Sequence, residues 1–273
     1  MLKARELHQE TKAVMKSWVA LIGITVLIAL SPINLRAETF TFAVADNTID
    51  TVVSEVILKK AYRMLGHQIE ILRLPAKRAL ENANAGIYDG DVQRIFNVAK
   101  SHTNLIRLEP PINYIHGTGF VNKGAKIDVR SWDDLKKYKV GIILGIRFAE
   151  TNVPKQNAVI FHNYKKLTAA IASNGIDIGI YPESNGIYQT LFSNEENIVP
   201  LETPLAKFEL YHYIHKKNHW LTNDLQRIFA EFAKNGTLMK VRQRVLEISF
   251  SRARKGLEPC FIDYACYQSV WDD

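Results

Sequence analysis

The sequence lacks the residue patterns that metal sites and nucleophilic hydrolases commonly carry. Its 273 residues include only two cysteines, Cys260 and Cys266, which do not form a Cys-x-x-Cys pair. There is no Gly-x-Ser-x-Gly and no His-Glu-x-x-His motif, so a nucleophile elbow and a zinc-protease site are both excluded. His215 and His219 have helical metal-ligand spacing, but they lie where an extended segment runs into a lysine-rich turn. We therefore expect no metal, no cofactor and no catalytic residues.

Long hydrophobic runs are also missing. The most apolar stretch, residues 18–30 (WVALIGITVLIAL), has 13 residues, whereas a membrane-spanning helix needs about 20. It follows a start with four lysines and arginines and precedes a candidate cleavage site at Ala37. This order predicts a secretory signal peptide over residues 1–37 and a periplasmic location. The alternative is an uncleaved N-terminal anchor.

A strong charge of one sign is absent from the rest of the chain. The whole sequence has 35 Lys and Arg against 28 Asp and Glu, and removing the first 37 residues leaves 30 against 26, a net charge of +4. No run of basic and aromatic residues resembles a nucleic-acid-binding surface. We expect no nucleic-acid partner, and the charge gives only a weak bias toward anionic ligands.

The two cysteines are close together in the C-terminal tail. In an oxidising compartment, the simplest prediction for Cys260 and Cys266 is a disulfide. The loop that it closes is short, so we expect a modest stabilisation.

After residue 38 the apolar pattern alternates between strands and helices. Short apolar runs at 40–45, 69–74 and 92–96 predict strands, and the segments between them predict helices. Strands separated by helices of this length are typical of a parallel α/β sheet. Residues 38–118 therefore form a first α/β block.

The alternation restarts near residue 131. Ser131 and Asp134 have the spacing of a capping box at a helix start, and a helix is predicted over 163–173. The predicted strands that follow Ser131 span 139–144, 158–161 and 176–181.

Two extended segments, 114–123 and 207–216, bracket this second block. A chain that crosses over, builds a second block and returns gives two lobes joined by two crossover hinge segments. We predict lobe 1 from residues 38–118 plus 210–273, and lobe 2 from residues 119–209. The final part of lobe 1 is predicted to be helical.

Three stretches give the sequence a resemblance to a known family: 131–145 (SWDDLKKYKVGIILG), 167–183 (LTAAIASNGIDIGIYPE) and 221–244 (LTNDLQRIFAEFAKNGTLMKVRQR). In order and spacing they resemble the type II periplasmic solute-binding proteins, the amino-acid-binding group of bacterial transport systems. The likeness spans nearly all of the chain after residue 38. It implies a two-lobed α/β fold, a ligand held between the lobes and delivery to an ABC-type membrane permease, and we expect a monomer.

One region departs from the family pattern. Amino-acid binders usually carry a Thr-x-x-Arg element after the third strand, whose arginine grips the ligand carboxylate. Here the segments PAKRAL (75–80) and DGDVQR (89–94) resemble a divergent branch with Pro-x-x-Arg and Asp-Gly-x-x-x-Arg patterns. The fold prediction is unaffected, and the identity of the ligand stays open.

Candidate ligand contacts are the polar residues at the ends of predicted strands, because ligands of open α/β sheets bind beyond the carboxyl ends. An arginine can grip a carboxylate with two hydrogen bonds, and backbone amides at a helix start suit an anion. Glu183, which ends the stretch 167–183, could hold an ammonium group, as the resemblance implies for the family's acid at that place. The candidate residues are Asp46, Arg78, Arg94, Gly145, Arg147, Tyr181 and Glu183.

Structural roles are the alternatives for these residues. Arg78 could cap its helix or pair with Glu81, and Arg147 could be an ordinary solvated helix residue. Tyr114 and His116 are expected to pack within the crossover segment.

The sequence as a whole therefore predicts a periplasmic solute-binding protein that captures a small polar ligand, an amino acid or a related carboxylate, for transport. Two alternatives stay open: a ligand sensor that signals to a membrane receptor, and a periplasmic enzyme on the same fold.

Overall fold

The structure is a computed structural model that describes residues 37–45, 49–261 and 265–272. All described helices and strands belong to the unit Glu38–Asp273. The predicted signal peptide, apart from Ala37, and the candidate ligand residue Asp46 lie outside the described residues.

Among the described residues, no helix has both the length and the apolar character needed to cross a membrane.

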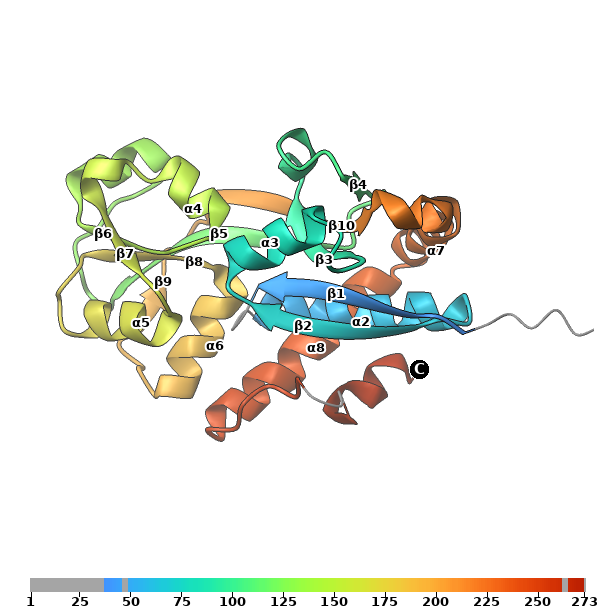
Figure 1. Cartoon of the computed structure of the whole chain (residues 1–273). Coiled ribbons are helices and arrows are strands. Elements are labelled where there is room, and N and C mark those ends of the chain that lie inside the picture. Colours follow the sequence, from blue (N-terminus) through green and yellow to red (C-terminus); the bar gives the residue numbers. More distant parts are fainter. Residues whose placement is uncertain (1–36, 46–48, 262–264, 273) are drawn as a thin grey trace, which may run out of the picture. The chain divides into compact units, whose positions relative to one another are not determined.

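The described strands form one mixed sheet (Figure 1). They are β1 (Thr39–Ala45), β2 (Gln68–Leu74), β3 (Gly90–Ile95), β4 (Leu105–Arg107), β5 (Asn113–Asn122), β6 (Val140–Ile143), β7 (Ala158–Phe161), β8 (Ile178–Pro182), β9 (Ile198–Pro200) and β10 (Ala206–His215). The order is β2-β1-β3-β10-β5-β8-β6-β7, with β4 also paired to β10 and β9 to β5. Read outward from the central pair β10–β5, the two half-sheets have equivalent orders.

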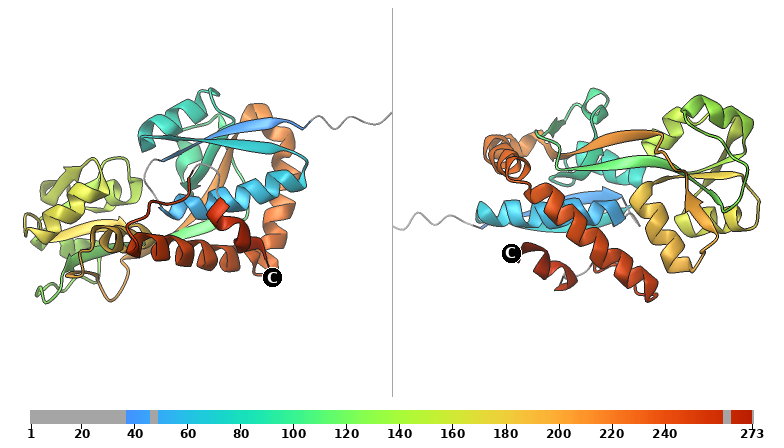
Figure 2. Two further views of the ribbon diagram at one scale, coloured as in Figure 1. Left: turned by 90° about the horizontal axis from the view of Figure 1, so that it is seen from below. Right: turned by 180° about the vertical axis from the view of Figure 1, so that it is seen from behind.

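The pairing confirms the two predicted α/β blocks. Strand β1 is parallel to β2 and β3, and β6 is parallel to β7 and β8. The two crossover strands, β5 and β10, are antiparallel to each other and run side by side between the half-sheets (Figure 2). The fold is therefore a two-lobed α/β fold with two crossover segments, and the lobe boundaries given above remain a prediction.

Helices cover the strands on both sides. They are α2 (Ile49–Met64), α3 (Ala76–Asn84), α4 (Arg147–Asn152), α5 (Tyr164–Ala172), α6 (Glu183–Ser193), α7 (Thr222–Lys234) and α8 (Thr237–Arg254), with short 3-10 helices η1 (Val98–Lys100), η2 (Trp132–Lys137), η3 (Lys155–Asn157), η4 (Lys216–Leu221) and η5 (Ala265–Trp271). In Figure 1, α3 lies above β1 and β2, and α8 lies below them. The capping box of Ser131 and Asp134 is confirmed at the start of η2. Helix α6 was not predicted.

Each lobe has its own buried apolar core. In lobe 1, side chains of β1, α2, α7 and α8 pack together, including Phe42, Leu58 and Phe229, which are fully buried. In lobe 2, Leu135 and Val140 belong to one cluster and Phe120 and Leu167 to another. Burial of this apolar surface is the main favourable term in folding. We therefore expect residues 38–273 to fold without the first 37 residues.

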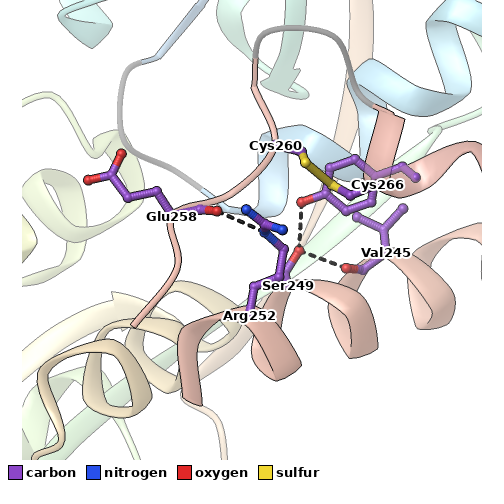
Figure 3. The surroundings of a disulfide bond; sticks show 7 residues. Val245, Ser249, Arg252, Glu258, Cys260 and Cys266 are labelled. Carbon is purple, nitrogen blue, oxygen red and sulfur yellow. Dashed lines mark hydrogen bonds between the residues drawn. A yellow bond between two sulfur atoms is a disulfide. The ribbon is translucent and has the colours of Figure 1, made fainter. Parts of the chain in front are cut away.

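The predicted disulfide between Cys260 and Cys266 is present (Figure 3). It lies between the end of α8 and η5, and both cysteines pack against the lobe 1 core. Tyr267, one residue beyond the bond, is buried, and its hydroxyl lies 3.0 Å from that of Ser249 in α8. Packing of both cysteines and Tyr267 therefore holds the C-terminal tail on lobe 1, and the disulfide closes a short loop within this tail.

Reduction of this disulfide should lower the free energy of unfolding by about 2 kcal/mol, because the six-residue separation closes only a short loop in the unfolded chain. Urea unfolding of residues 38–273 with and without dithiothreitol measures the change. A Cys260→Ser, Cys266→Ser variant should be insensitive to the reductant. An equal response of the variant would show that the effect does not come from this bond.

Candidate functional site

The starts of α3 in lobe 1 and α4 in lobe 2 lie against each other. A Cβ atom added to Gly145, two residues before α4, would lie only 3.0 Å from the Cβ of Ala76, the first residue of α3. Gly145 also has φ +88°, a left-handed conformation that glycine adopts without strain. Glycine therefore allows the turn after β6 to approach the other lobe closely.

The backbone amide of Gly145 already has a partner within the protein. It donates a 2.7 Å hydrogen bond to Oε1 of Glu150, on α4. The anion-binding role of this amide stays a prediction, and an anion there would compete with the carboxylate of Glu150.

Arg94 is engaged in the same way. Its Nε donates to Oδ2 of Asp91 at 2.8 Å, its Nη2 lies 2.6 Å from the same oxygen, and Nη2 also donates to the Ala76 carbonyl at 3.0 Å. Asp91 is fully buried, and burial raises the pKa of its carboxyl while the charge of Arg94 opposes this. Nε and Nη2 of Arg94 thus hold Asp91 and the Ala76 carbonyl, and its contact with a ligand stays a prediction.

Two arginines near these helix starts have no such partner. Arg78 in the first turn of α3 and Arg147 at the start of α4 are both exposed, and no ion pair or hydrogen bond joins either guanidinium to another described residue. The i,i+4 pair on α3 joins Glu81 to Lys77 and not to Arg78. Each arginine lies two residues after the point where Ala76 and Gly145 touch.

Tyr181 lies in the lobe 2 core. Its side chain is 1% exposed, its ring stacks on Tyr164 with centroids 5.5 Å apart, and its hydroxyl lies 2.9 Å from that of Thr168. Burial raises the pKa of this phenol well above its usual value. Tyr181 therefore packs within lobe 2, and its contact with a ligand stays a prediction.

Glu183 begins α6 and contacts a crossover strand. Its Oε2 lies 3.0 Å from Nδ1 of His116 on β5, and both side chains are about one-third exposed. Beside this pair, the buried hydroxyls of Ser184 and Thr118 have no partner within the described part of the chain. Buried hydroxyls normally have one, so the start of α6 retains hydrogen-bonding capacity.

The start of α6 also contacts the start of α2 in lobe 1. The side-chain oxygen of Asn185 accepts hydrogen bonds from the backbone amides of Ile49 (2.6 Å) and Asp50 (3.3 Å). Four helix starts therefore surround the region between the lobes, in two facing pairs: α3 with α4, and α2 with α6.

Sequence reasoning missed Asn185, Asp50 and the His116 contact, because they depend on α6. The signal for α6 was present in the hydrophobic spacing of Tyr188 and Phe192, which stack at 5.7 Å one turn apart. Gly186 obscured it, since glycine is unfavourable within a helix. Here glycine is required, because any Cβ would collide with the ring of Phe120.

Metal binding finds no support in the part of the chain that the structure describes, where no group of three or more His, Cys, Asp or Glu side chains could hold an ion.

Comparison with known proteins relates this geometry to solved folds. No protein-family model matches the chain. An uncharacterized protein of Shewanella oneidensis is 25% identical over 198 residues, which cover 70% of this chain and 75% of the relative.

Several solved structures have a similar fold. The GluR0 ligand-binding core in complex with L-glutamate superposes with a TM-score of 0.66 at 14% identity, over 77% of this chain and 99% of that one. The amino acid ABC transporter substrate-binding protein AbpA of Streptococcus pneumoniae, bound to L-arginine, gives 0.65 at 15% identity, over 78% and 96%. A histidine kinase sensor domain with similarity to periplasmic binding proteins gives 0.61 at 16% identity, over 77% and 96%. The chain has the type II periplasmic-binding-protein fold.

In this type II fold, the two pairs of facing helix starts define the candidate cleft. The α3/α4 pair carries Arg78 and Arg147, which have no partner among the described residues, and α6 carries Glu183 and Ser184. Gly145, Arg94 and Tyr181 make hydrogen bonds to other parts of the protein.

Proposed function

We propose that the chain is an exported, periplasmic solute-binding protein that holds an amino acid or a related small carboxylate between its two lobes. It passes this ligand to a membrane permease of the ABC type and performs no chemistry on it. The single observation that carries the proposal is that Arg78 and Arg147, which have no partner among the described residues, each lie two residues after the contact between Ala76 and Gly145.

The arginines suit an anionic group for a geometric reason. A guanidinium offers a planar fork of donors that matches a carboxylate, and the two forks come from opposite lobes. A carboxylate held by both would therefore favour the lobes being close together. We assign the grip to these two arginines rather than to Arg94, because Nε and Nη2 of Arg94 already bind Asp91 and the Ala76 carbonyl.

The opposite side of the cleft suits a positive group. Glu183 is partly exposed and is positioned by His116, while Ser184 and Thr118 supply buried hydroxyls without partners among the described residues. A carboxylate beside free hydroxyls can accept and orient an ammonium group. Together the two sides fit a zwitterion.

A thermal-shift screen of residues 38–273 against amino acids, small carboxylates, polyamines and sugars tests the proposal. A ligand that binds only the folded protein raises its melting temperature. At a ligand concentration of 100 times Kd, it adds about 2.7 kcal/mol to the free energy of unfolding. We expect hits among the amino acids or carboxylates. Hits confined to sugars or polyamines, or none at all, would contradict this ligand class.

Removing both arginines should weaken binding of such a hit about 100-fold. Each charge-assisted hydrogen bond contributes about 1.5–3 kcal/mol, and the variant Arg78→Ala, Arg147→Ala removes the grip from both lobes. Calorimetric titration measures the affinity. The matched control is Lys77→Ala, which removes an exposed cation of α3 that pairs with Glu81. Equal affinities in the double variant and the control would contradict the assigned contacts.

A sensor is the second candidate function. Its support is that one solved structure with this fold is a histidine kinase sensor domain. In that case the liganded protein would bind a membrane receptor rather than a permease. Binding of the ligand-loaded protein to a permease and to a receptor ectodomain is compared. Binding to the permease supports transport, and binding to the ectodomain supports the sensor role.

A further inference from the structure

A buried polar network joins the two lobes at the α2/α6 edge of the cleft. Asn185 of α6 accepts hydrogen bonds from the amides of Ile49 and Asp50, and its Nδ2 donates to Oδ1 of Asp50 at 2.5 Å. An asparagine from one lobe therefore caps a helix of the other lobe and also pairs with that helix's first acidic side chain. Asn185 and Asp50 are 2% and 5% exposed.

The network continues into the sheet behind the cleft. Gln93 of β3 donates from Nε2 to the second oxygen of Asp50 at 2.7 Å. Asn113, at the start of crossover strand β5, donates to the Asp50 carbonyl at 2.9 Å and accepts a 2.6 Å hydrogen bond from Arg242 of α8. Both carboxylate oxygens of Asp50 and both functional ends of Asn185 are thus satisfied, which is the condition for a buried polar network to stabilise one arrangement.

The two edges of the cleft differ in what opening would break. At the α3/α4 edge, the contact is apolar, between Ala76 and the glycine at 145. At the α2/α6 edge, separation would break the hydrogen bonds that Asn185 makes with Oδ1 of Asp50 and with two backbone amides. Breaking three hydrogen bonds, one of them to a charged group, costs more than losing one van der Waals contact.

We propose that Asn185 is a positioning residue that clamps α6 onto the start of α2, so that the lobes separate at the α3/α4 edge while the α2/α6 edge stays closed. The clamp concerns the lobes alone and holds whether or not the proposed ligand class is correct. It assigns Arg78 and Arg147 to the moving edge, and Asp50 and Asn185 to the fixed one.

The test measures distances in ligand-free residues 38–273 by pulsed electron spin resonance. Spin labels attached to a keto amino acid leave the native disulfide intact. Labels at positions 63 and 196, on α2 and just after α6, report the clamped edge, and labels at 77 and 155 report the moving edge. All four positions are exposed. The wild-type protein should give a narrow distribution for 63–196 and a broader one for 77–155.

Asn185→Ala should shift the 63–196 distribution to longer and broader distances. The swap Asp50→Asn, Asn185→Asp should restore it, because the new amide can donate to the new carboxylate, which still accepts from the two helix amides. Each single variant, Asp50→Asn or Asn185→Asp, should have a broader 63–196 distribution than the swap. Asn185→Asp places two carboxylates next to each other. A double-mutant cycle on the melting temperatures should therefore show strong coupling.

Asn163→Ala is the matched control, because Asn163 caps α5 within lobe 2 by accepting from the Lys166 amide at 2.9 Å. It should lower the melting temperature and leave the 63–196 distribution narrow. An unchanged 63–196 distribution in Asn185→Ala, or a swap variant that remains broad, would overturn the proposal. If Asn185→Ala does not fold, the swap carries the test: a folded swap with the wild-type distribution supports the clamp, and an unfolded one overturns it.

Discussion

Replacing Arg94 by alanine should lower the free energy of unfolding by about 3–5 kcal/mol. The reason is that Asp91 is fully buried and has Arg94 as its charged partner at 2.6 Å. Among the described residues, the variant would leave this interior carboxylate with one hydrogen bond, from the Gln93 backbone amide to its other oxygen at 3.2 Å. Urea unfolding at pH 7 measures the loss.

Two variants make this result specific. Arg78→Ala removes an exposed arginine without a described partner and should change stability by no more than about 0.5 kcal/mol. Adding Asp91→Asn to Arg94→Ala removes the uncompensated charge and should recover part of the loss. If Arg94→Ala is as stable as Arg78→Ala and fails to bind the ligand, Arg94 is the carboxylate grip after all.

The unfolding free energy should fall by about 3 kcal/mol between pH 6.5 and pH 4 through His212 alone. Burial lowers the pKa of this imidazole from 6.5 to about 4, because the ring is fully buried between Phe42 and Tyr62. Between these two values the unfolded chain binds a proton that the folded protein does not. The stabilisation is therefore complete above pH 6.5 and is lost as the pH falls toward 4.

His212→Gln separates this effect from the titration of the carboxylates. In the folded protein, Nδ1 of His212 donates to the Asp91 carbonyl at 3.0 Å, and Nε2 accepts from the Tyr62 hydroxyl at 3.0 Å. A glutamine amide can donate and accept in the same places without titrating. The stability difference between wild type and variant should decrease by about 3 kcal/mol on acidification. A constant difference would mean that His212 takes up its proton at the same pH in both states.

The fold could be predicted because its local and global signals agree. Apolar runs at β1, β2 and β6 alternate with helical spacing in α2 and α5, and this pattern is typical of parallel α/β units. The extended segments that became β5 and β10 marked the crossovers. The short strands β4 and β9 were missed, since three residues carry no periodicity.

The site was harder to predict because it depends on which groups find partners. The sequence places Arg94 and Gly145 correctly at strand ends, but it does not reveal that Asp91 and Glu150 occupy them. Those pairings arise from tertiary distances and not from spacing. Tyr181 likewise lies near the end of β8. Side chains alternate between the two faces of a strand, and that of Tyr181 lies on the face toward Thr168 in the core.

The most direct test of the account is the distance between labels at positions 77 and 155, measured before and after adding the ligand found in the thermal-shift screen. The account predicts that the ligand shortens and narrows this distance in the wild-type protein, because it bridges Arg78 and Arg147 across the moving edge. The Arg78→Ala, Arg147→Ala variant should not respond at the same ligand concentration. A ligand that raises the melting temperature yet leaves the 77–155 distance unchanged would contradict binding between the lobes.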